Sequence, residues 1–210
     1  MRRALPWVLA IIFLVGFVAS FTELQRMRTR FGEVSQHRFH DHAAVREFMI
    51  RAALTGATAP IVVLGDSITE MAPLPRQLCG RPVINAGVGG QTIRDAKQLA
   101  PRLLEDQGAF LLVLAVGAND AGSPTAQRDF ADLIDTVKPL STRPLVAIAV
   151  AADGATNQAI EVAAVARNIR FIDPHLPSGA KMSDGIHFTA AAYKAWVPAL
   201  EAAISAECTM

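Results

Sequence analysis

The chain has 210 residues, of which 51% are hydrophobic and 19% are charged, and its formal net charge is +1. A hydrophobic fraction of this size supports a folded core and excludes an intrinsically disordered chain. Because 20 basic residues are balanced by 19 acidic ones, the chain lacks the strong positive charge typical of nucleic-acid-binding proteins. We therefore expect one compact domain with an appendage and no nucleic-acid partner.

The N-terminus contains a long apolar stretch. Arg2 and Arg3 precede ALPWVLAIIFLVGFVASF at residues 4–21, which carries no charge. As a helix it would be about 27 Å long, close to the ~30 Å of a bilayer's hydrocarbon core. The stretch is longer than the apolar part of a typical signal peptide, so residues 1–21 favour a signal-anchor, with a cleaved signal peptide as the alternative. We expect the rest of the chain to face the periplasm or the cell exterior.

Residues 22–56 predict a helical stalk or linker, because apolar residues recur at helical spacing and Gly56 is a plausible stop. Within it, His37, His40 and Asp41 would share one helix face. A metal site there lacks a visible fourth ligand and the spacing of a zincin motif. Solvent-facing histidines are therefore the favoured interpretation, and we expect no metal.

Residues 57–210 alternate between short apolar runs and amphipathic helical patterns. The apolar runs lie at 61–64, 83–84, 110–116, 145–150 and 171–172. Nearly continuous apolar strands separated by helices are typical of a parallel sheet covered on both faces. We predict a single α/β domain with a five-stranded parallel sheet. The strand order 2-1-3-4-5 would place the ends of the first three strands side by side.

Short polar segments follow four of these runs. They read GDS at 65–67, NAGVGGQT at 85–92, GAND at 117–120 and, after a loop, SDGIHFT at 183–189. The carboxyl ends of parallel strands meet at one edge of the sheet, where ligands of open α/β sheets bind. The sequence therefore predicts a functional site at that edge.

The residue types in these segments suit acyl transfer. Ser67 would be a nucleophile, with His187 as its base and Asp184 orienting the imidazole. The N–H groups of Ser67 and Gly90 and the side-chain amide of Asn119 would stabilise an oxyanion. Taken singly, the serine could be a helix cap, the asparagine a turn residue and the histidine a surface residue. Their joint occurrence at strand ends favours catalysis.

Other residues of these segments favour structural roles. We expect Asp66 and Asp120 to hold their own loops through turn hydrogen bonds. The glycines within 87–90 do not form a dinucleotide-binding motif, because Thr92 occupies the third glycine position of GxGxxG. Thr69 likewise replaces the second glycine of the GxSxG elbow of α/β-hydrolases.

The four blocks GDSIT, NAGVGGQT, GAND and DGIH together resemble the SGNH hydrolases of the GDSL esterase/lipase superfamily, over about residues 60–205. The resemblance implies a flavodoxin-like three-layer sandwich and no cofactor. It also implies a catalytic triad of Ser67, Asp184 and His187. The oxyanion hole that it implies consists of Ser67, Gly90 and Asn119.

The expected activity is that of a metal-independent serine esterase or acylhydrolase working through an acyl-enzyme. Short loops between the blocks favour an open site and a small acyl ester, such as an O-acetyl group on a carbohydrate. An O-acyltransferase would share the covalent step, and a non-catalytic envelope module that binds a glycan is a further alternative. Cys79 and Cys208 form no CxxC motif, and the sequence leaves their pairing and the oligomeric state open.

Overall fold

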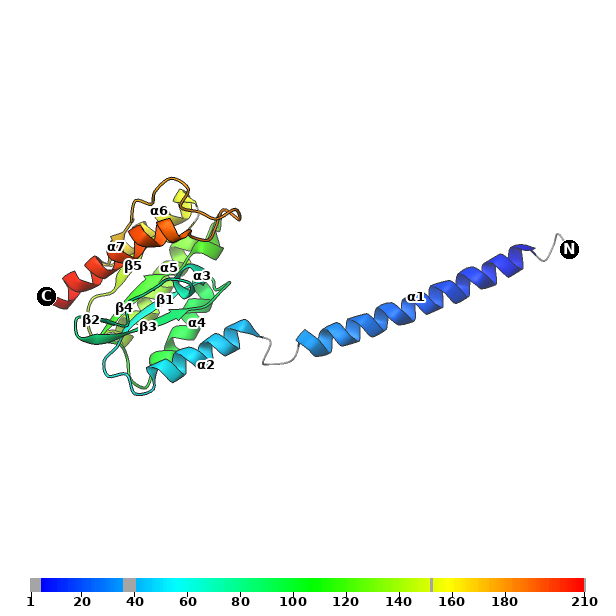
Figure 1. The fold of residues 1–210 in the computed structure, drawn as a ribbon, viewed down its shortest axis with the longest axis horizontal. Coiled ribbons are helices and arrows are strands. Elements are labelled where there is room, and N and C mark those ends of the chain that lie inside the picture. The colour runs from blue at the N-terminus through cyan, green and yellow to red at the C-terminus, as the bar shows by residue number, and fades with distance from the viewer. Residues whose placement is uncertain (1–4, 36–40, 152, 210) are drawn as a thin grey trace. The chain divides into compact units, whose positions relative to one another are not determined.

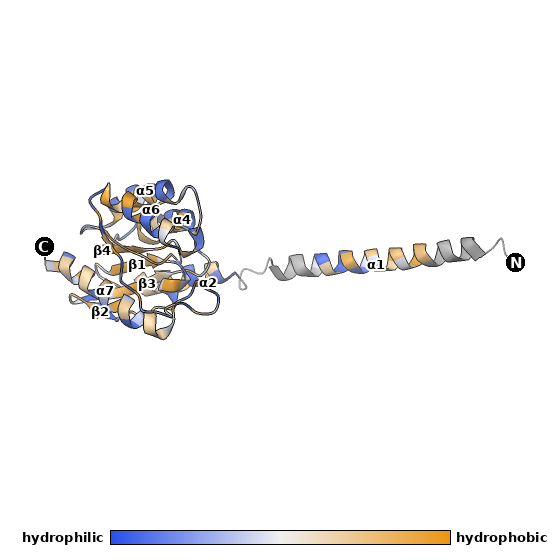
Figure 2. Cartoon of the chain, turned by 90° about the horizontal axis from the view of Figure 1, so that it is seen from above, coloured by the Kyte–Doolittle hydropathy of each residue, from blue (hydrophilic) through white to orange (hydrophobic). Residues whose placement is uncertain are grey.

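A computed structural model describes residues 5–35, 41–151 and 153–209 (Figure 1). The chain divides into two compact units, Met1–Val45 and Arg46–Met210. The first unit contains helix α1 (Leu5–Ser35), part of which is hydrophobic by the colour scale of Figure 2. Its exposed large apolar side chains include Phe13, Phe17 and Phe21.

The N-terminal expectations fall only partly on described residues. The stretch 4–21 begins outside them, and His37 and His40 of the conceivable metal site lie outside them entirely. Among the helices that are described, none is both long and apolar enough to cross a membrane.

The second unit holds the sheet and the polar segments. The elements that build it are, in chain order, α2 (His42–Leu54), β1 (Ile61–Gly65), α3 (Ser67–Glu70), β2 (Gln77–Leu78), β3 (Arg81–Gly87), α4 (Ile93–Leu104), β4 (Leu111–Ala115), η2 (Ala118–Asp120), α5 (Ala126–Val137), η3 (Lys138–Leu140), β5 (Val146–Ile148), α6 (Gly154–Val165), β6 (Arg170–Ile172) and α7 (Ala190–Thr209).

The sheet has six strands in the order β2-β3-β1-β4-β5-β6. The five strands from β3 to β6 are parallel, and their order confirms the predicted 2-1-3-4-5 arrangement. The predicted count of five was wrong, because β2 adds a short antiparallel edge to β3. A two-residue strand with one exposed residue buries too little to produce an apolar run in the sequence.

Helices cover both faces of this sheet and form a three-layer sandwich (Figures 1 and 2). In β1, Val62 and Leu64 face a core shared with α2, α4, α5 and α6. Ile61 and Val63 face the opposite core, which α3 and α7 complete. Because both faces of each central strand are buried, these strands read as continuous apolar runs rather than as alternating ones.

Helix α2 packs on the sheet rather than preceding it as a stalk. Its Ile50 and Leu54 are spaced by one helical turn, and their exposed fractions are 1% and 2% within the main core. The compact unit therefore begins at Arg46, upstream of the boundary expected at residue 57. Two apolar residues one turn apart are compatible with either an isolated helix or a packed one, so the sequence pattern did not reveal that the sheet covers Ile50 and Leu54.

Cys79 and Cys208 form a disulfide with a Cα–Cα distance of 6.4 Å. It joins the turn before β3 to the end of α7. The amino end of β3 lies at the sheet edge opposite the polar segments, so this link stabilises the unit away from the candidate site.

Candidate active site

The candidate nucleophile Ser67 is the first residue of α3, directly after β1. Two glycines let this short helix lie against the strand ends. A Cβ atom at Gly65 would overlap the Thr69 side chain, and one at Gly87 would overlap the backbone of Glu70. The local sequence therefore places the serine hydroxyl at the carboxyl edge of the sheet.

A hydrogen-bonded chain joins three predicted residues. His187 Nε2 lies 2.9 Å from Ser67 Oγ, and His187 Nδ1 lies 2.6 Å from Asp184 Oδ2. The hydrogen bond from His187 holds the pKa of the Asp184 carboxyl down at about 2. An ionised carboxylate only accepts hydrogen bonds, so Nδ1 carries the imidazole proton and Nε2 is free to accept from the serine.

A compact turn presents the acid–base pair. The second carboxylate oxygen of Asp184 accepts from the N–H groups of Ile186 and His187, at 2.9 and 3.0 Å. Gly185 adopts a φ of 73°, which suits glycine in a tight turn. Lys181 and Phe188 pair in an antiparallel bridge that closes the base of the turn. The side chains of Asp184 and His187 remain 44% and 32% exposed, so the pair faces solvent.

Asp66 connects two strand ends. Its Oδ1 accepts from Ile68 N at 2.9 Å and caps α3, as a residue holding its own loop would. Its Oδ2 also accepts from the N–H groups of Gly117 and Ala118, at 3.1 and 2.9 Å. The side chain is fully buried, and this burial raises the pKa of the carboxyl. The expectation that Asp66 serves only its own loop was therefore too narrow.

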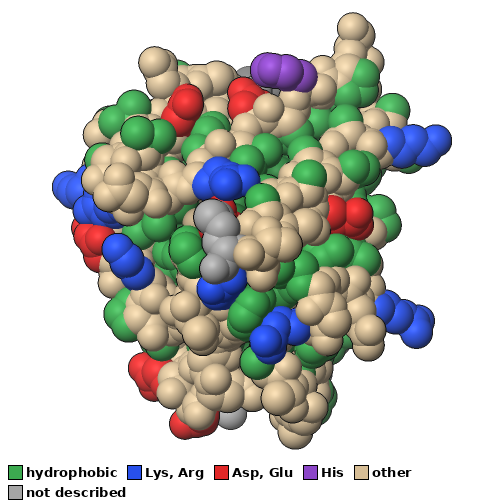
Figure 3. Space-filling model, turned by 90° about the vertical axis from the view of Figure 1, so that its left-hand side faces the viewer, with side chains coloured by type: hydrophobic (Ala, Val, Ile, Leu, Met, Phe, Trp, Pro, Cys, Tyr) green, Lys and Arg blue, Asp and Glu red, His purple; other side chains and the backbone are tan. Residues whose placement is uncertain are grey.

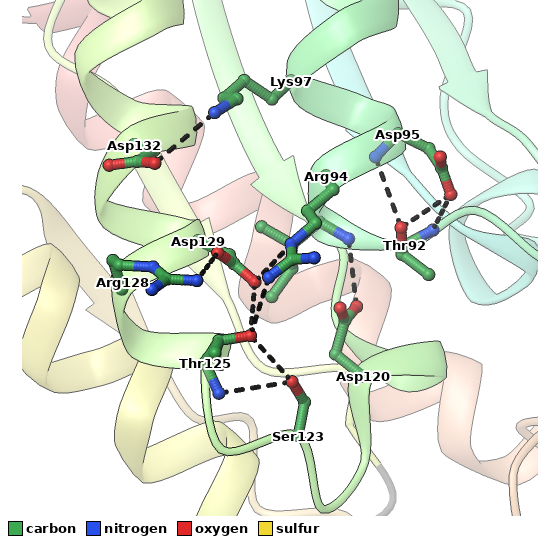
Figure 4. Close-up of polar contacts among 11 residues, drawn as sticks. Thr92, Arg94, Asp95, Lys97, Asp120, Ser123, Thr125, Arg128, Asp129 and Asp132 are labelled. Carbon is green, nitrogen blue, oxygen red and sulfur yellow. Dashed lines mark hydrogen bonds and ion pairs between the residues drawn. The ribbon is translucent and has the colours of Figure 1, made fainter.

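Asp120 also bonds outside its own loop. Its Oδ2 accepts from Ile93 N at 3.0 Å, at the start of α4 (Figure 4). The same helix start is closed by a capping box between Thr92 and Asp95. The expectation of a purely local turn bond was wrong. The fold brings the start of α4, 27 positions away in the sequence, within hydrogen-bonding distance of this carboxylate.

The three predicted oxyanion donors occupy neighbouring strand ends. Asn119 lies on η2, and its Nδ2 donates to Gln91 O at 2.9 Å, which leaves its second N–H available. Gly90 has a φ of 77°, which explains glycine there. Within the described part of the chain, neither Ser67 N nor Gly90 N donates a hydrogen bond to another protein group. These N–H groups are therefore free to bind a ligand.

Sequence reasoning missed three residues that hold the site together. Asn85 Nδ2 donates to Thr69 O at 2.7 Å and so binds β3 to α3. Glu70 and Arg46 join the same strand end to α3 and α2. Asn85 and Glu70 adjoin the recognised blocks and could have been found there. Nothing in the sequence around Arg46 indicated such a role.

An apolar groove of about 560 Å³ lies between α3 and α7. The residues that line it are Met71, Pro73, Ala190, Tyr193, Lys194, Val197 and Pro198. Met71 follows Ser67 by one helical turn, and Ala190 follows His187 by three residues. The Tyr193 hydroxyl donates to Ile68 O at 2.7 Å, and burial raises its pKa to about 12. Residues close in sequence to Ser67 and His187 therefore line the groove, whereas Ser67 and His187 themselves do not.

Charge distribution and metal-ligand groupings were compared on the described residues. Positive and negative side chains are interspersed over the face of the molecule in Figure 3, without a large patch of one sign. Among the described residues, no group of three or more histidine, cysteine, aspartate or glutamate side chains is placed to hold a metal ion.

The six-stranded α/β sandwich and the Ser–His–Asp chain at its carboxyl edge define the class of the SGNH hydrolases. The chain belongs to the GDSL-like Lipase/Acylhydrolase family, which it matches over residues 63–195. The resemblance seen in the sequence blocks is thereby confirmed.

Solved structures share this fold at low sequence identity. A protein from Streptococcus pneumonia, provisionally described as a platelet activating factor, has a TM-score of 0.65 and 19% identity, covering 85% of this chain and 99% of its own. The lipase/acylhydrolase from Enterococcus faecalis has a TM-score of 0.56 and 19% identity, and the match covers 71% of this chain and 96% of its own. A catalytic mutant of Axe2, an acetylxylan esterase from Geobacillus stearothermophilus, has a TM-score of 0.51 and 16% identity. This match covers 73% of the present chain and 95% of the Axe2 chain. A search of curated proteins returned no match.

Proposed function

We propose that this protein is a serine ester hydrolase in which Ser67 forms an acyl-enzyme. The observation that carries the proposal is the continuous hydrogen-bonded chain from Asp184 through His187 to Ser67, with distances of 2.6 and 2.9 Å. A lone capping serine would not need an imidazole within hydrogen-bonding distance and a carboxylate behind it.

In the first half-reaction, Ser67 Oγ attacks the ester carbonyl carbon while its proton passes to His187 Nε2. The carbonyl oxygen becomes an oxyanion, which the donors of Ser67, Gly90 and Asn119 stabilise. Asp184 remains ionised and stabilises the imidazolium. When the tetrahedral intermediate collapses, the alkoxide leaves and takes the proton from Nε2, so the alcohol departs and the serine carries the acyl group.

In the second half-reaction, water takes the place of the alcohol. His187 removes a proton from the water as it attacks the acyl carbon, and then returns that proton to Ser67 Oγ. The products are the free serine and the carboxylic acid. An acyltransferase would use the hydroxyl of an acceptor at this step, because the acyl-serine is common to both reactions.

The proposed substrate is an ester of a small acyl group, such as O-acetyl on a carbohydrate. Two observations support it: the solvent-facing catalytic turn, and the structural similarity to a protein described as an acetylxylan esterase. The apolar groove beside α3 favours a second candidate, an ester with a longer acyl chain lying between Met71 and Val197.

Two measurements test the proposed function. A fluorophosphonate should label the full-length chain at Ser67, and Ser67→Ala should abolish labelling, whereas Ser205→Ala on α7 should not. A protein that resists labelling and hydrolyses no p-nitrophenyl ester would be a binding module instead. A series of acyl groups from acetyl to octanoyl then decides between the substrates, and Met71→Glu should depress octanoyl turnover relative to acetyl turnover only if the groove holds the chain.

We also propose that the catalytic unit is exported and that residues 4–21 anchor it. The uncharged apolar stretch and a disulfide, which persists mainly in oxidising compartments, support this location. The full-length protein should remain with membranes after carbonate extraction. Recovery of a mature chain beginning near Phe21 would show cleavage and secretion instead.

A further inference from the structure

A partly buried ion pair connects helix α2 to the loop that carries Gly90. Arg46 donates from Nε and Nη2 to Gly87 O, at 3.0 and 2.8 Å, and from Nη2 to Asn85 O at 3.3 Å. Its Nε also lies 3.3 Å from Glu70 Oε1. One guanidinium thus holds two carbonyl groups at the end of β3 and a carboxylate on α3.

The second oxygen of this carboxylate continues the connection. Glu70 Oε2 accepts from Gly89 N at 2.6 Å, directly before the candidate oxyanion donor Gly90. The side chains of Arg46 and Glu70 are only 15% and 19% exposed. A charge-assisted bond of this kind is shorter and stronger than a neutral one, and partial burial protects it from screening by salt.

We infer that Arg46 and Glu70 position the oxyanion loop for catalysis. An oxyanion donor is effective only if it is held in place before charge develops. Gly90 is a glycine with a φ of 77°, whose own backbone restricts it little. The Arg46–Glu70 pair supplies this restraint by fixing the peptide groups on both sides of Val88. It acts through the loop and does not touch substrate, so the two residues are positioning residues.

One member of this pair lies in a part of the chain that the family match does not reach. The match covers residues 63–195, whereas Arg46 lies on α2 and is the first residue of the compact unit. The site of this protein is therefore completed by a helix upstream of the four sequence blocks. The inference rests on the proposed esterase activity for its catalytic consequence.

A matched pair of full-length variants tests the inference. Arg46→Met keeps the aliphatic stem and removes the guanidinium. Arg51→Met alters the same helix at a 47% exposed side chain that pairs with Glu47. For p-nitrophenyl acetate we expect kcat to fall about 10–100-fold in the first variant, with KM little changed, because the donor is misplaced rather than lost. The second variant should keep its kcat.

A folded Arg46→Met chain with wild-type kcat would overturn the inference. If that variant does not fold, Arg46→Lys decides, because lysine keeps the charge but cannot make the forked contact with Gly87 O. We expect a smaller fall in kcat there, and an unchanged kcat would overturn the inference.

Amide exchange at Gly89 separates this inference from the proposed function. Its N–H should exchange at least about tenfold faster in Arg46→Met than in Arg51→Met, whether or not the protein turns over esters. Equal Gly89 exchange rates in the two variants would refute the inference that Arg46 positions this loop. A wild-type chain without esterase activity would refute the proposed function while leaving this readout intact.

Discussion

Two aspartates of the candidate site lie in opposite environments. Asp66 is fully buried, bonds three backbone N–H groups from two strand ends, and has its pKa raised by burial. Asp184 is on an exposed turn, bonds its own histidine and two local N–H groups, and has its pKa lowered to about 2.

The difference between the two aspartates separates a buried structural contact from a local, solvent-exposed one. The candidate nucleophile and the candidate oxyanion donors lie at strand ends, where the buried hydrogen bonds of Asp66 join two of these ends. The candidate acid–base pair is oriented locally by a short turn in contact with water. We therefore expect substitution of Asp66 to affect stability and geometry together, and substitutions in the turn to affect turnover more than stability.

The largest effect on turnover is expected from Asp184→Asn. Two backbone N–H groups occupy Oδ1, so the amide oxygen must take that place and the amide nitrogen must face His187 Nδ1. The imidazole then carries its proton on Nε2 and cannot accept one from Ser67. We expect kcat to fall by about 10⁴-fold. Asp184→Ala should retain more activity, and the reverse ranking would contradict this account of the tautomer.

Asn119→Ala tests whether the amide acts on the transition state. Loss of one oxyanion donor should lower kcat about 10²–10³-fold, with KM little changed. Because the Asn119 amide also bonds Gln91 O, the melting temperature must be measured beside kcat. A variant that keeps its kcat would remove Asn119 from the catalytic residues, and loss of stability without a specific loss of kcat would indicate a purely structural bond.

Asp66→Asn should lower the stability of the fold more than it lowers turnover. An amide offers one acceptor atom where the carboxylate offers two, so at least one of three buried N–H groups loses its partner. We expect the free energy of unfolding to fall by about 1–3 kcal/mol, with a smaller loss of kcat than in Asn119→Ala. Asp132→Asn is the control, since its carboxylate is 49% exposed, and an equal loss there would refute the argument from burial.

The two carboxylates should also give opposite pH dependence of stability. Asp66 has a raised pKa in the folded state, so its contribution is greatest below its unfolded pKa and declines as pH rises through the folded value. Asp184, with a folded pKa of about 2, contributes above its unfolded pKa and loses that contribution as pH falls toward 2. Denaturant titrations of the wild type and each asparagine variant at pH 3 to 7 would measure both slopes. If the contributions of Asp66 and Asp184 to the free energy of unfolding changed with pH in the same direction, the proposed difference between the two carboxylates would be refuted.

The smallest effect on turnover is expected from removing the disulfide. Cys79 and Cys208 are 129 residues apart, and closing so long a loop typically stabilises a fold by about 2–4 kcal/mol. Cys79→Ser with Cys208→Ser should therefore lower the denaturation midpoint and leave kcat at 25 °C unchanged. A large loss of kcat in the folded variant would show that the far end of the sheet is coupled to the site.

Much of the architecture follows from local patterns. Central strands buried on both faces leave continuous apolar runs, and the glycine-containing segments after them mark where each strand ends. Ser67, Asp184 and His187 could be selected because each lies in such a segment. The short edge strand β2 and the packing of α2 could not, because a two-residue strand and one apolar helical pair carry too weak a pattern.

The sequence by itself determined the class of the fold and the candidate residues, because hydrophobic periodicity and turn chemistry are local properties of the chain. Only the tertiary structure decided which groups meet. Asp66 bonding Gly117, Asp120 bonding Ile93 and Arg46 bonding Gly87 each join residues at least 27 positions apart. Such partners depend on strand order and burial, since a buried charge bonds whichever donors the fold brings to it.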